Sequence, residues 1–182
     1  MSHHVADHWA HVIHEYSRSR RRLTLAGAHR KFPLTSGIMF GLGFGGLFDG
    51  IVLHQLLQWH HVASARRPPE TLADLQFNVA LDGLFHLAAL GFVLIALVLL
   101  WRTGRRRQVW WSGRMLSGAI LMGFGIFNLA EGLISHHLLG LHHVNETVPS
   151  GQQVFWDIGF LLWGAAMLVL GRRLYRRGRL VP

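Results

Sequence analysis

Histidines and carboxylates occur at matched positions in two apolar stretches, residues 48–62 and 130–144. The matched pairs, each 82 positions apart, are Asp49 with Glu131, Gly50 with Gly132, His54 with His136, His60 with His142 and His61 with His143. Chance seldom keeps an acid, a glycine and three histidines in register, so the pattern predicts an internal duplication. Imidazole and carboxylate groups are transition-metal ligands, and metal binding is the chemistry that this set of residues suggests first.

The second half of each repeated unit adds further polar side chains. Residues 82–85 (Asp-Gly-Leu-Phe) resemble residues 157–160 (Asp-Ile-Gly-Phe), at an offset of 75 because the loop before the first copy is longer. His86 follows the first copy, whereas Leu161 takes its place in the second. Asp82, His86 and Asp157 therefore join the candidate metal ligands.

The composition indicates a membrane protein. The chain has 182 residues, 51% of them hydrophobic, with a mean hydropathy of +0.28 and 18 Lys+Arg against 9 Asp+Glu. A basic chain can bind nucleic acid, but these basic residues cluster between long uncharged runs, so the expected partner is the lipid bilayer and not nucleic acid. The absence of cysteine excludes disulfides, thiolate metal sites and iron–sulfur clusters.

Four apolar segments are long enough to cross a bilayer, which takes about 20 helical residues. They run over about 33–61, 75–101, 109–141 and 153–170. We therefore expect an all-α integral membrane four-helix bundle within residues 32–173, built from two parallel two-helix repeats at about 33–101 and 109–171. The first segment formally matches G-x-G-x-x-G, but no strand precedes it, so its glycines are better interpreted as close helix packing.

Polar segments flank the expected bundle. Residues 1–31 are rich in His and Arg and predict an amphipathic helix on the membrane surface. One face of that helix carries His4, His8, His11 and Glu15, which could bind a metal, although a solvated polar face is the simpler interpretation. Residues 174–182 form a basic tail.

The distribution of basic residues predicts the orientation of the chain. Basic clusters lie near the N-terminus, at 102–107 and at 172–179, which all fall on one side of a four-helix topology. The positive-inside rule makes that side cytoplasmic. We expect a multi-pass protein of the bacterial inner membrane, with both termini in the cytoplasm and the histidine doublets toward the outer face.

Helical geometry predicts which polar side chains face the bundle interior. At about 100° per residue, Asp49, His54 and His61 share one half of the first helix, and the third helix copies this pattern. A rise of about 1.5 Å per residue then predicts three layers at increasing depth. The layers are His61, His143 and Asp157 outermost, then His54, His136 and Asp82, and finally Asp49, Glu131 and His86 near the midplane. On this view His60 and His142 are interfacial anchors, and His137 faces away from the site.

The stretch Phe48–His61, followed by Asp82-Gly83-Leu84-Phe85-His86, resembles a family of predicted bacterial membrane proteins, domain of unknown function 2243. The likeness covers about residues 34–173 and leaves the N-terminal His/Arg segment outside. The resemblance implies a four-helix membrane protein and brings no activity with it. It also suggests a setting near cytochrome-oxidase assembly, which would suit copper.

The leading hypothesis is an inner-membrane protein that binds a transition metal, copper first and otherwise zinc or iron, in the outer half of its bundle. It would serve metal handling, respiratory assembly or redox chemistry, with respiratory-chain or metal-delivery proteins as partners. One alternative is a membrane oxidoreductase with a di-metal or haem centre, of which haem fits less well. Another is a small transporter or proton-linked channel. The simplest is a structural membrane subunit whose polar residues only hold the helices together. The sequence assigns no oligomeric state and leaves open whether there is catalysis.

Overall fold

The computed structural model describes residues 14–18, 34–105 and 112–179. Its helices are α2 (Leu34–Phe48) continuing into η1 (Asp49–Leu56), α3 (Leu72–Gly104), α4 (Gly113–Glu131) continuing into η2 (Gly132–Leu138), and α5 (Ser150–Gly178). Four helical segments are long and apolar enough to cross a membrane, namely 34–56, 72–104, 113–138 and 150–178. The described chain contains no strand. The prediction of an all-α membrane protein with four spanning helices is confirmed.

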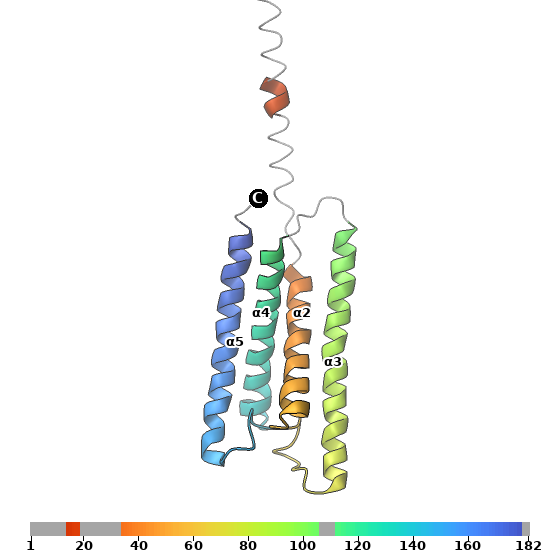
Figure 1. Ribbon diagram of the computed structural model, residues 1–182, viewed down its shortest axis with the longest axis vertical. Coiled ribbons are helices and arrows are strands. Elements are labelled where there is room, and N and C mark those ends of the chain that lie inside the picture. Colours follow the sequence, from red (N-terminus) through yellow and green to blue (C-terminus); the bar gives the residue numbers. More distant parts are fainter. Residues whose placement is uncertain (1–13, 19–33, 106–111, 180–182) are drawn as a thin grey trace, which may run out of the picture.

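The four helices stand side by side in the order α3–α2–α4–α5 (Figure 1). α2 and α4 are the central pair, α3 packs on α2, and α5 packs on α4. Within the described residues, no close backbone approach joins α3 to α5. Each outer helix therefore packs on the central helix of its own half, and α2 packing on α4 joins the halves.

Glycines set the close spacing of these helices. A Cβ at Gly41 would overlap the carbonyl oxygen of Ile120 and lie 2.6 Å from the Cα of Gly123 on α4. A Cβ at Gly43 would lie 2.8 Å from the carbonyl oxygen of Ala89 on α3. Small residues allow membrane helices to approach until their backbones touch. The glycines of the first segment therefore serve helix packing, as expected.

The outer helices expose long apolar faces. Leu84, Leu87 and Trp101 on α3 are each more than 60% exposed, and so are Phe155 and Leu162 on α5. In water such faces would be unstable, whereas the acyl chains of a bilayer solvate them. These faces fit the lipid contact expected of a membrane protein.

Two predicted helices end earlier than the apolar pattern suggests. The first and third segments were expected to continue to about 61 and 141, but their helical structure ends at Leu56 and Leu138. Just beyond these ends the chain turns, with positive φ at Gln58 (49°) and Gly140 (54°). α5 is longer than expected and takes in part of the predicted basic tail.

The expected N-terminal interfacial helix falls almost wholly outside the described residues. Residues 14–18 are helical, and the Ser17 hydroxyl donates to the carbonyl oxygen of His14 at 2.8 Å. The predicted polar face with His4, His8 and His11 lies outside the described residues.

Candidate metal centre

The site begins where each central helix changes from α-helical to π-helical geometry. Backbone bonds from Leu57 N to Val52 O and from Leu139 N to Ile134 O, both 2.8 Å, join residues five positions apart. η1 and η2 are thus π-helices, which are rare and frequently occur at functional sites. A turn of this kind holds roughly four to five residues, so side chains five apart share a face. Asp49 and His54 are five apart, as are Glu131 and His136, and both pairs are brought together.

The turn after each π-helix returns a second histidine to the same place. Gln58 and Gly140, which are aligned in the two stretches, both adopt the left-handed conformation. The chain then runs back along the bundle end, and backbone bonds from Trp59 N to Leu53 O and from Leu141 N to Ser135 O fix its path. His60 and His142 are thereby buried next to the helices that they follow.

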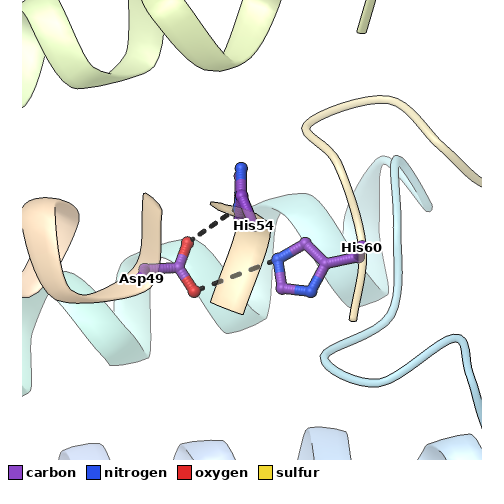
Figure 2. Close-up of side chains that lie close together, drawn as sticks. All are labelled: Asp49, His54 and His60. Atoms are coloured by element: carbon purple, nitrogen blue, oxygen red, sulfur yellow. Dashed lines mark ion pairs between the residues drawn. The ribbon is translucent and has the colours of Figure 1, made fainter. Parts of the chain in front are cut away.

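Two matching triads result, Asp49–His54–His60 and Glu131–His136–His142. In each triad, one donor atom from every residue lies within 4.8 Å of the other two. Figure 2 shows one oxygen of the Asp49 carboxylate facing His54 and the other facing His60, and the nitrogen–oxygen distances are 3.2 and 3.9 Å. The Glu131 carboxylate lies 3.0 Å from His136 Nε2 and 2.9 Å from His142 Nε2. None of the six residues is more than 9% exposed.

The facing atoms are close but do not form hydrogen bonds. The buried atoms without a hydrogen bond include the Nε2 atoms of all four histidines and both carboxylate oxygens of Glu131. Buried polar atoms are rarely left without a partner, because the lost hydrogen bond costs about 1–3 kcal/mol. Ligands bound tetrahedrally at 2.0–2.1 Å from a metal lie about 3.3 Å from one another. The nitrogen–oxygen distances in the triads, 2.9–3.9 Å, bracket this value, so the spacing is compatible with a cation between the atoms.

The opposite ring nitrogens of three of these histidines have partners. His54 Nδ1 lies 3.0 Å from Asp82 Oδ1, His60 Nδ1 lies 2.8 Å from the Val144 carbonyl oxygen, and His142 Nδ1 lies 3.0 Å from the Val62 carbonyl oxygen. His136 Nδ1 lies 3.5 Å from Asp157 Oδ1 without a hydrogen bond. Nδ1–H donation to an oxygen leaves Nε2 as the lone-pair nitrogen and fixes the ring, as in metal-binding histidines generally.

Asp82 and Asp157 form a supporting layer behind the triads. Asp82 accepts from Val62 N at 3.0 Å, and its Oδ2 lies 2.6 Å from His61 Nδ1. Asp157 accepts from Val144 N at 2.9 Å, and its Oδ2 lies 2.6 Å from His143 Nδ1. Both acids therefore hold the returning loops, and Asp82 also holds His54. His61 and His143 contact the acids and not the triads.

The charge environments of His60 and His142 differ. Burial, together with the neighbouring His142 and His54, holds the pKa of His60 well below its usual value. Burial also acts to lower the pKa of His142, but the Glu131 carboxylate close to its Nε2 outweighs burial and raises that pKa. The difference follows from distance, since Glu131 approaches His142 more closely than Asp49 approaches His60. The lowered pKa of His60 favours the neutral imidazole, which is the form that binds metals.

The three predicted layers of the site pair His54 with Asp82 and His143 with Asp157 correctly, but they are wrong in separating Asp49 from His54. They assumed an α-helix continuing to His61, which would separate Asp49 from the outer histidines. The π-helix and the reversed turn instead place Asp49, His54 and His60 in one cluster. His60 and His142, interpreted as interfacial anchors, are members of the triads, and the in-register doublets were the signal that pointed to them.

His86 and His137 lie outside the triads. His86 Nδ1 is 2.6 Å from the carbonyl oxygen of Asp82 on its own helix, and its ring lies against Gly50, where a Cβ would be 2.6 Å from Nε2. The predicted ligand role of His86 therefore finds no support in its position. His137 is exposed, as expected.

The family model of predicted membrane proteins known as DUF2243 matches residues 36–178. The chain belongs to this family. The match covers the four spanning helices except the first two residues of α2, includes both triads, and begins after the N-terminal His/Arg segment. Neither the curated proteins nor the solved structures compared with the chain contain a match.

Proposed function

We propose that this membrane protein binds divalent transition-metal ions in the two triads. The observation that carries the proposal is the set of four buried Nε2 atoms that face carboxylate oxygens without hydrogen bonds. A site with two imidazoles and one carboxylate is a common ligand set for zinc and for non-haem iron(II). Copper(II) accepts the same donors and binds most tightly among the divalent first-row ions, so copper is the first candidate.

The donor set and the surroundings limit the kind of metal chemistry. The triads contain no sulfur, which argues against a site for copper(I). His60 and His142 stack between His54 and His136, as the ring distances along the series (4.4, 4.3 and 4.8 Å) indicate. A haem bound between His54 and His136 would have to displace both, so we favour metal ions over haem.

The proposed setting is the bacterial inner membrane, with the triads at the outer end of the bundle. In the described chain, the basic residues that end α3 and α5 lie where α2 begins, whereas the triads and the loops around them lie at the opposite end (Figure 1). The positive-inside rule then places the termini in the cytoplasm. A buried metal site on the outer side would serve metal handling, respiratory assembly or redox chemistry, with respiratory-chain or metal-delivery proteins as partners.

Elemental analysis of the purified protein tests the proposal. Protein in detergent is incubated with copper(II) or zinc sulfate and freed of unbound metal, and its metal content is then measured. The wild type should retain stoichiometric metal, and His54→Ala/His136→Ala should lose it. His137→Ala is the matched control, because His137 is an exposed histidine directly beside His136, and it should bind as the wild type does. Equal metal content in the wild type and the double variant would contradict the proposal.

A further inference from the structure

The two triads touch each other. The rings of His60 and His142, one from each triad, stack with centroids 4.3 Å apart and an angle of 4° between their planes. Other ring distances across the boundary are 6.0 Å for His54–His142 and 6.4 Å for His60–His136, compared with 4.4 and 4.8 Å inside the triads. Ions bound in the two triads would therefore be close neighbours.

Each half of the chain also supports the other half's histidine. His60 Nδ1 contacts the carbonyl oxygen of Val144, and His142 Nδ1 contacts that of Val62, so the two contacts are reciprocal. Two backbone hydrogen bonds also join the halves, one from Glu146 N to Trp59 O and one from Ala65 N to Leu141 O, both 2.9 Å. Neither triad has a complete set of supporting contacts without the other half.

The charges favour two cations. The buried carboxylates at the site are Asp49, Glu131, Asp82 and Asp157. In the described chain, every ion pair that they form is with a histidine, while Arg66 bonds the carbonyl oxygen of Leu139 and Arg67 pairs with Asp74. An uncompensated charge inside a membrane protein costs several kcal/mol. Two divalent ions would bring four positive charges, the number that balances these four carboxylates when the histidines are neutral.

From these contacts and charges we infer that the two triads form a single binuclear centre, which holds a pair of divalent transition-metal ions next to each other. The inference rests on the proposed metal binding and adds the number of ions and their mutual contact. Each ion takes two imidazole Nε2 atoms and one carboxylate. The stacked His60 and His142 form the shared wall between the ions.

The test uses copper(II) as a spin probe and zinc(II) for stoichiometry. Wild-type protein should hold two equivalents of either ion. Its copper should show a weakened or broadened electron paramagnetic resonance signal, because two neighbouring unpaired spins interact. Asp49→Asn and Glu131→Gln, which each disable one triad at nearly constant size, should hold one equivalent with a sharp signal that accounts for every bound copper. His137→Ala should behave as the wild type.

The outcomes separate the inference from the proposed function. No metal in the wild type would overturn both. One equivalent in the wild type, or two equivalents that give the signal of isolated copper, would overturn the binuclear centre and leave metal binding standing. If a carboxamide variant aggregates on size-exclusion chromatography, His60→Gln and His142→Gln address the same two triads.

Discussion

At the scale of residues, the two nitrogens of each imidazole have different tasks. In His54, His60 and His142, Nδ1 contacts an oxygen of the protein and Nε2 faces the triad. His60 and His142 can contact the site in this way only because the chain reverses after η1 and η2. The reversal depends on a left-handed residue, Gln58 in one half and Gly140 in the other.

The left-handed turn gives a prediction at this scale. An L-residue with a side chain pays about 1–2 kcal/mol in that conformation, and glycine does not. Gln58→Gly should therefore raise the free energy of unfolding by about 1 kcal/mol, and Gly140→Ala should lower it by about the same amount. The added Cβ at position 140 would also press on Arg66 Nη2 at 3.3 Å. Thermal unfolding in detergent measures both effects, and a stabilised Gly140→Ala would contradict the account.

At the scale of elements, helix geometry and helix contacts position the site. η1 and η2 bring a carboxylate and a histidine five residues apart onto one face, which an α-helix would not do. α3 and α5 supply Asp82 and Asp157 from outside the central pair. The α2–α4 contact, made of glycines and small residues, sets the separation of the triads.

The α2–α4 contact predicts the effect of adding a single methyl group. Gly41→Ala should separate the two backbones and destabilise the protein by about 1–3 kcal/mol, as overpacking does. It should also weaken metal retention, because the separation of the two triads depends on the same contact. Gly91→Ala is the control, since its added Cβ meets nothing within 4 Å, and better helix propensity should leave stability unchanged or slightly higher. Equal melting temperatures for the two variants would argue against a tight α2–α4 contact.

At the scale of the whole molecule, the basic residues and the triads lie at opposite ends of the bundle. Arg172, Arg173, Arg176 and Arg177 end α5 at the same end of the bundle as the start of α2 (Figure 1). The opposite end carries the interlocked loops and the triads. A membrane potential and the positive-inside rule both favour the basic end in the cytoplasm.

Cysteine labelling tests this orientation directly. The chain has no cysteine, so single-cysteine variants carry one reactive thiol. Glu70→Cys, in the exposed loop near the triads, should react with a membrane-impermeant maleimide added outside cells whose outer membrane has been permeabilised. Arg177→Cys, exposed at the basic end, should react only after lysis. The reverse pattern would place the triads on the cytoplasmic side.

Much of the architecture follows from the sequence alone. Hydrophobic runs longer than a bilayer's width between basic clusters predict four spanning helices, because lipid leaves the backbone few alternatives to a helix. The in-register acids and histidines predicted that Asp49, Glu131, His54 and His136 belong to a site. The duplication itself remains a prediction, supported by the matching turns, triads and supporting acids of the two halves.

Only the tertiary structure decided which of the polar residues meet. Regular α-helical spacing spread Asp49, His54 and His61 over separate depths and left His60 aside. The π-helical turns and the left-handed Gln58 and Gly140 replaced that spacing with a compact triad in each half. Such turns depend on contacts between the loops of opposite halves, as in His60 with Val144 and His142 with Val62. Residue spacing along one helix does not contain that information, because it arises from contacts between segments about 80 residues apart in the chain.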